Sequence, residues 1–108
     1  DDVLARGERF KQMRGAFSLF YVWGHSYEVA CQNNWELIEE FCRSMSAVPE
    51  IWYATNIEIY DYVMAARRLE FSADGSLVHN PNALTVWLRV AGKGEIKAVP
   101  SGQTVSLA

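Results

Sequence analysis

The sequence FSLFYVWGHSYE, residues 17–28, joins an apolar run to a polar end. Residues 17–23 are apolar except for Ser18 and include aromatic and β-branched types, a pattern typical of a strand that is covered on both faces. Gly24 follows, and a glycine lets the backbone turn sharply. We therefore expect a buried strand at 17–23 that places His25 at its carboxyl end, where α/β folds bind their ligands.

The composition is that of a single small domain. The chain has 108 residues, and half of them are hydrophobic, which is enough for a modest core. The formal net charge is −3 and Arg67 with Arg68 is the only adjacent basic pair, so we expect no nucleic-acid partner. No apolar run approaches the length of a membrane-spanning helix, so we expect no membrane partner.

Helix and strand patterns alternate through residues 1–68. The expected elements are a helix at 3–14, the strand at 17–23, a connection at 29–33, a helix from Trp35 with Asn34 as N-cap, a strand at 51–54, and a helix at 57–68 capped by Thr55 or Asn56. Strands that alternate with helices over short links imply an α/β fold with parallel strands and right-handed crossovers.

The middle helix carries an apolar stripe. Trp35, Ile38, Cys42 and Met45 recur at helical spacing, and we expect this stripe to pack in the core. Cys42 would then be a small buried hydrophobic residue rather than a nucleophile. Cys31 and Cys42 lack partners at metal-ligand spacing, and we expect reduced thiols rather than a disulfide.

Residues 69–108 have a different character, because short β-prone runs alternate with turn clusters. The expected strands lie at 70–72, 77–79, 84–90, 95–98 and 104–107. They predict a small antiparallel appendage, so the domain organisation is 1–68 followed by 69–108. His79 stands next to a turn and is expected to be a surface or capping residue, because no second ligand stands at metal spacing.

His25 is the candidate for chemistry. A histidine at a strand end can act as general acid or base near neutral pH, although such a residue is more often structural. Ser26 cannot be assigned to a triad, because neighbours in sequence rarely reach nucleophile-to-base geometry. Glu58 and Asp61 are one helical turn apart, but favourable charges at a helix N-terminus explain them more simply than a metal or acid/base pair does. The residue pattern gives this chain no metal site.

Four blocks carry a family resemblance: FYVWGHSYE, NNWELIEEFC, IWYATNIEIYDYV and FSADGSLVHNPNALTVWL. In this order and with these gaps, they resemble the C-terminal part of the NodB-type polysaccharide deacetylases, from Phe17 onward. The resemblance implies a fragment of a distorted (β/α) barrel with the β appendage at its C-terminus. Family members have an aromatic residue and an acid after the glutamate, whereas this chain has Val29 and Ala30 there.

The resemblance also implies a chemistry. In that family a divalent, zinc-like metal and an aspartate base activate water to attack an acetamide, and a histidine protonates the departing amine. The matching histidine here is His25, and Trp23, Tyr27 and Glu28 beside it are the candidate substrate-binding residues. The metal-binding and base motifs have no counterpart in this sequence, so we expect a fragment of an enzyme for N-acetylated polysaccharide that is inactive alone and forms homo-oligomers through exposed barrel edges.

An alternative function class is a non-catalytic carbohydrate-binding or interaction module. Exposed aromatic residues such as Trp87, Tyr53 or Tyr27 would stack on sugar in such a module. Trp87 lies in an alternating strand, and we expect it to belong to the core.

Overall fold

The computed structural model describes residues 2–13 and 17–108 and divides the chain into two compact units. The first unit ends at Trp52, and the second comprises Tyr53–Ala108. The first contains three helices, α1 (Asp2–Gln12), α2 (Ser26–Gln32) and α3 (Trp35–Met45). The second contains α4 (Asn56–Arg67) and the strands β1 (Glu70–Phe71), β2 (Leu77–His79), β3 (Val86–Arg89), β4 (Ile96–Val99) and β5 (Thr104–Ser106).

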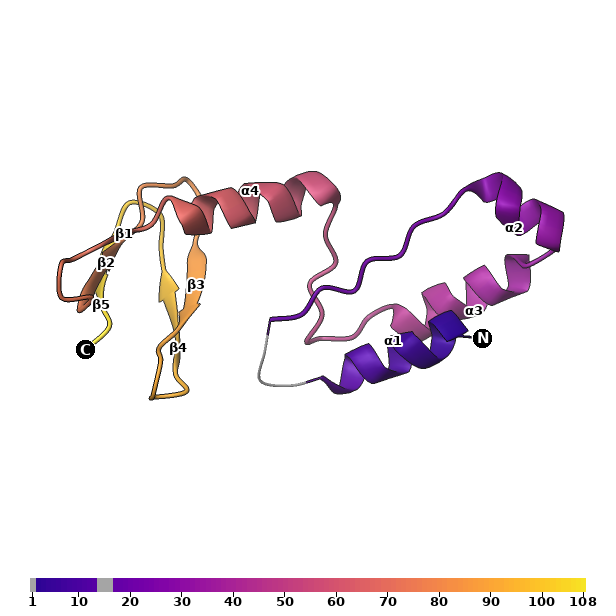
Figure 1. Cartoon of the computed structure of the whole chain (residues 1–108), viewed down its shortest axis with the longest axis horizontal. Helices are drawn as coiled ribbons and strands as arrows, with labels where there is room; N and C mark the ends of the chain where they lie inside the picture. The colour runs from indigo at the N-terminus through magenta and orange to yellow at the C-terminus, as the bar shows by residue number, and fades with distance from the viewer. Residues whose placement is uncertain (1, 14–16) are drawn as a thin grey trace. The chain divides into compact units, whose positions relative to one another are not determined.

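In the first unit, α1 and α3 pack against each other (Figure 1). Gly7 of α1 permits a close approach, because a Cβ at this position would lie 2.8 Å from the Met45 sulfur. Beside this contact, the Phe20 ring lies 5.3 Å from the Phe10 ring and 6.1 Å from the Phe41 ring. The three phenylalanines extend the small apolar contact between the helices.

The predicted strand at 17–23 is wrong for the described structure. These residues lie outside both sheets, and Phe17 and Trp23 are each 75% exposed. The predicted strand at 51–54 also lies outside both sheets. A strand is stabilised by hydrogen bonds to a neighbouring strand and by side chains that cover its faces. Residues 17–23 and 51–54 pair with no strand of either sheet, and the regular elements of the first unit are helices. The parallel arrangement expected for 1–68 is therefore not formed by the described residues.

The predicted helices differ from the observed ones mainly in where they begin and end. The connection expected at 29–33 belongs mostly to α2, which ends where Asn33 adopts a left-handed conformation with φ 54°. The predicted helix at 3–14 ends at Gln12 in the structure, and its last position lies outside the described residues. Helix α3 begins at Trp35, as predicted.

Helix α3 buries only part of the expected stripe. Met45 is buried and Phe41 is half-buried, whereas Trp35, Ile38 and Cys42 are exposed. The prediction of a buried Cys42 is therefore wrong. Because α3 is apolar on more than one side, its neighbour α1 determines which side is covered.

Helix α4 begins with a capping box, and the predicted cap at Thr55 is confirmed. The Glu58 amide donates to Thr55 Oγ1 at 3.4 Å, and Glu58 Oε2 accepts from the Thr55 amide at 2.6 Å. Further along the helix, the hydroxyl of Tyr62 accepts a hydrogen bond from the Trp87 amide at 2.9 Å. Helix α4 thus packs with the strands, whereas the sequence suggested a division at 68–69.

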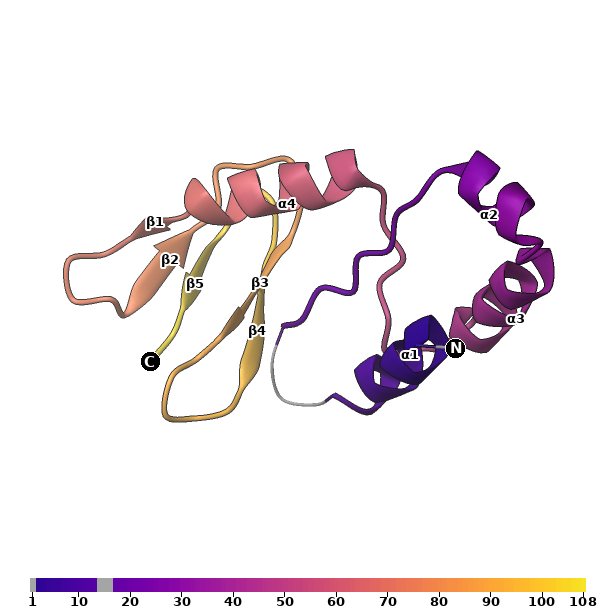
Figure 2. The same cartoon turned by 45° about the vertical axis from the view of Figure 1, so that its right-hand side comes forward.

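The five predicted strands are confirmed with small shifts at their ends, and all of their pairings are antiparallel. One sheet has the order β1-β2-β5, and β3 pairs with β4 in the other. Figure 2 shows α4 with both sheets. Facing pairs such as Val86 with Val99 and Trp87 with Ala98 alternate between the two sides of the β3-β4 ribbon.

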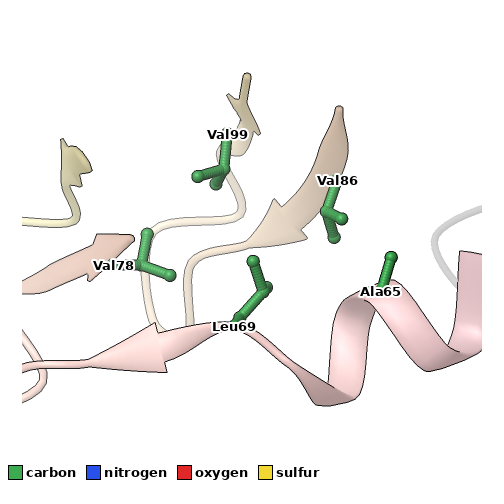
Figure 3. Close-up of a cluster of buried hydrophobic side chains, with 5 residues drawn as sticks. All are labelled: Ala65, Leu69, Val78, Val86 and Val99. Carbon is green, nitrogen blue, oxygen red and sulfur yellow. The ribbon is translucent and has the colours of Figure 1, made fainter. Parts of the chain in front are cut away.

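The core of the second unit lies between α4 and the two sheets. It is formed by apolar side chains that converge in Figure 3, namely Ala65, Leu69, Val78, Val86 and Val99. The three valines have no exposed surface. The residues of this cluster come from α4, from the segment after it and from both sheets, so their packing holds the helix and the two sheets together.

Candidate functional site

His25 is the N-cap residue of α2. Its backbone is extended, with φ −104° and ψ 140°, so the chain changes direction here from the extended segment to the helix. The Glu28 amide donates to the His25 carbonyl at 3.1 Å, and Glu28 Oε2 accepts from the His25 amide at 3.4 Å. Both bonds fix the backbone of His25 at the first turn of α2.

Three aromatic rings gather around this position. The His25 and Tyr27 rings are stacked, with centroids 5.1 Å apart and planes inclined by 12°. The Trp23 ring meets the imidazole nearly at a right angle, with a centroid distance of 6.1 Å. All three residues are exposed, Tyr27 to 63%. The structure therefore brings together His25 and its three predicted neighbours, Trp23, Tyr27 and Glu28.

This arrangement suits proton transfer and stacking. An imidazole exchanges protons in the plane of its ring, whereas stacking occupies the ring face, so the two uses are compatible. Exposed indole and phenol rings also offer flat apolar faces to a sugar. Because His25 is exposed, a substrate can reach it without a conformational change.

Glu28 is the residue whose structural role the sequence analysis missed. Its carboxylate caps α2 by accepting from the His25 backbone, and His-x-x-Glu has the same spacing as the Ser/Thr-x-x-Glu capping signal. Gly24 is less critical than expected, because its φ is not positive and a Cβ there would meet only Glu28 Oε2 within 4 Å, at 3.6 Å. The turn at this site is thus made by the cap and not by the glycine.

Glu58, a candidate acid of the sequence analysis, has a structural role as part of the cap of α4. Hydrogen bonds from the Thr55 backbone and hydroxyl lower the pKa of Glu58 below its usual value, as expected for a capping carboxylate. Within residues 2–13 and 17–108, no three His, Cys, Asp or Glu side chains gather in a way that could hold a metal ion. The described residues therefore do not fit the divalent metal that the family resemblance implies.

The remaining predicted residues belong to the second unit. Trp87 is 50% exposed, so the prediction that it belongs to the core is wrong; its neighbours in β3, Val86 and Leu88, occupy the covered side. Tyr53 is also about half exposed, at 53%. His79 Nδ1 lies 3.0 Å from Thr104 Oγ1, in agreement with a structural role.

Both cysteines are exposed, and no disulfide joins them in the structure. Cys31 lies near the end of α2 and Cys42 lies on α3. We assign no chemistry to either cysteine.

Comparisons with protein-family models, curated proteins and solved structures find no match for this chain. No helix in the described part of the chain has the length and apolar character needed to cross a membrane. The local geometry and the sequence resemblance are therefore the basis for a functional proposal.

Proposed function

We propose that this chain is the C-terminal portion of a metal-dependent carbohydrate N-deacetylase and that His25 is its general acid. The resemblance of the ordered sequence blocks motivates the proposal. The observation that carries it is the exposed imidazole of His25, which lies at the first turn of α2 in contact with the rings of Trp23 and Tyr27.

In the proposed reaction, water would lose a proton to a base that this chain does not supply and add to the carbonyl carbon of an acetamide, and the bond from that carbon to nitrogen would break. Protonated His25 gives its proton to the departing nitrogen, which leaves as an amine instead of an unstable anion. Trp23 and Tyr27 stack on the sugar, and Glu28 holds the His25 backbone. The metal would polarise the acetamide and be held by residues that this chain does not contain.

The proposal is tested on the full-length product of the gene that encodes this chain, with N-acetylglucosamine oligomers as substrate. Replacement His25→Ala is expected to reduce acetate release by roughly 10²-fold to 10⁴-fold, the usual contribution of a general acid. His79→Gln is the matched control, because His79 contacts Thr104 and has no proposed role in the reaction. Equal activity of His25→Ala and the unmodified protein would exclude His25 as the acid.

The 108-residue chain alone is expected to release no acetate, because it lacks the residues for the metal and the base. Metal-dependent deacetylation by this chain would contradict that part of the proposal. The sequence encoded before Asp1 is an independent check, and we expect it to contain a paired-aspartate motif and a His-x3-His motif.

A carbohydrate-binding module is the second candidate, and the exposure of Trp87 favours it. The indole is half exposed on the outer side of the β3-β4 ribbon, beside Arg89 and Ile96. Binding of chitin oligomers that persists in His25→Ala but is lost in Trp87→Ala would support this module over the enzyme. Loss of binding in His25→Ala with retention in Trp87→Ala would favour the site at α2.

A further inference from the structure

The His25 ring has two torsions that the helix cap does not fix. The cap acts through the backbone amide and carbonyl of His25, and both bonds end on Glu28. An exposed side chain ordinarily exchanges between rotamers in picoseconds to nanoseconds. A proton donor must nevertheless present one ring nitrogen in a defined direction.

The neighbouring rings restrict these torsions. Tyr27 covers one face of the imidazole at a centroid distance of 5.1 Å and an inclination of 12°, which is the geometry of an offset stack. Trp23 meets the same ring at 89°, so rotation of the imidazole would disturb two contacts of different orientation. A stack on a phenol face is also attractive to a cationic ring, so the contact is kept when the imidazole carries its proton.

We propose that Tyr27 is a positioning residue that holds the His25 imidazole ring by stacking, with its aromatic face rather than its hydroxyl. This inference rests on the proposed function for its catalytic consequence, but the stack itself can be measured without substrate or metal. Tyr27 is the second residue of α2, and its side chain reaches back to the cap residue two positions earlier.

The first test is proton NMR of the full 108-residue chain with Tyr27→Leu, Tyr27→Phe and Tyr60→Leu. Tyr27→Leu is expected to remove the upfield contribution of the stacked Tyr27 ring to the shifts of the His25 ring protons, and Tyr27→Phe is expected to keep it. Tyr60→Leu is the matched control, because Tyr60 is 59% exposed on α4, close to the 63% of Tyr27. The amide resonances of Val29 and Ala30 report whether α2 persists in each variant.

Two results would overturn the inference. One is a set of His25 ring resonances that is the same in Tyr27→Leu and in the unmodified chain. The other is a Tyr27→Phe variant whose His25 ring-proton shifts match those of Tyr27→Leu, since this would mean that the Tyr27 hydroxyl, and not its ring, holds the imidazole. The Phe replacement keeps the ring and the helix position, so the conclusion does not depend on a variant that fails to fold.

The second test uses the full-length gene product. Tyr27→Leu is expected to lower kcat by roughly 10-fold to 100-fold, as for a misplaced catalytic group, and to raise KM as well, because the ring that stacks on the sugar is lost; Tyr27→Phe is expected to restore both. An unchanged kcat in Tyr27→Leu would overturn the positioning role. If the gene product does not deacetylate at all but the ring-current shift behaves as expected, the proposed function fails and the stack remains.

Discussion

At the scale of single residues, Asp74 organises the turn between β1 and β2. Its Oδ1 accepts hydrogen bonds from Ser72 Oγ at 2.8 Å, from the Ser76 amide at 3.0 Å and from Ser76 Oγ at 2.7 Å. Gly75 follows with φ 72°, a conformation that glycine adopts without strain. The hydrogen bonds from Ser76 and Ser72 lower the pKa of Asp74 from 3.8 to about 2.

This pKa predicts a pH dependence of stability. The folded state binds the Asp74 proton more weakly than the unfolded state, so the stabilisation is complete above the unfolded pKa near 3.8 and is lost as the pH falls through about 2. We expect Asp74→Asn to be less stable than the unmodified chain near neutral pH, with a difference that shrinks below pH 4. Urea unfolding at a series of pH values measures it, and a difference that does not change with pH would contradict this assignment.

Asn80 is the buried polar residue of the second unit. Its side-chain amide donates to the carbonyls of Leu84 at 2.8 Å and of Val99 at 2.7 Å, and its oxygen accepts from the Asn82 amide at 2.9 Å. These bonds tie the segment after β2 to the segment before β3 and to the end of β4. The side chain has no exposed surface, so its polar atoms rely on these protein partners instead of water.

We therefore predict that Asn80→Leu lowers the free energy of unfolding by about 2 kcal/mol or more, because it removes the hydrogen bonds to the Leu84 and Val99 carbonyls and from the Asn82 amide, of which the bond to Val99 is buried. Chemical denaturation of the chain measures this loss. The control is Gln103→Leu, at an exposed position just before β5, where a small effect is expected. A loss at Asn80 no larger than that at Gln103 would contradict this prediction.

At the scale of elements, the contact between α1 and α3 depends on a glycine inside a helix. Glycine costs a helix about 1 kcal/mol relative to alanine. At Gly7 an added Cβ would meet the Met45 sulfur at 2.8 Å, which is too close for any ordinary contact. The close packing of the two helices offsets the poor helix propensity of this residue.

A double-mutant cycle tests this balance. We predict that Gly7→Ala destabilises the chain when Met45 is present and stabilises it by up to about 1 kcal/mol in the Met45→Ala background, where only helix propensity remains. Thermal unfolding of the four proteins gives the coupling. An equal effect of Gly7→Ala in both backgrounds would mean that Met45 moves aside without cost.

At the scale of the whole molecule, large apolar side chains are exposed in both units. Examples are Phe17 and Trp23 before α2, Trp35 on α3, and Trp87 and Ile96 on the β3-β4 ribbon. Monomeric soluble proteins rarely leave large apolar patches uncovered. Covering of such side chains by another surface would be strongly favourable, at about 25 cal/mol for each Å² of apolar area.

We predict that the chain self-associates at micromolar concentrations and that Trp23→Lys weakens this association, because it places a charge among the exposed aromatic residues. Sedimentation velocity over a range of concentrations measures both effects. Glu39→Lys, at an exposed polar position of α3, is the control and should change association less. A clean monomer at high concentration would contradict the expected oligomer.

The candidate site could be predicted in part. The position of His25 after an apolar run indicated a chemical role, and the same four residues lie together in the structure. What the sequence could not show is the reason for their proximity. The expected buried strand does not form in the described structure, and the residues are instead held by the first turn of α2.

The sequence alone determined the features that depend on residues a few positions apart. The cap at Thr55, the turns of residues 69–108 and their antiparallel strands were all predictable, because capping and turn formation are satisfied locally. Only the tertiary structure decided which apolar sides are covered, as in α3, where Met45 is buried and Trp35 is exposed. Burial depends on which surface finds a partner, and local sequence spacing alone does not specify that partner.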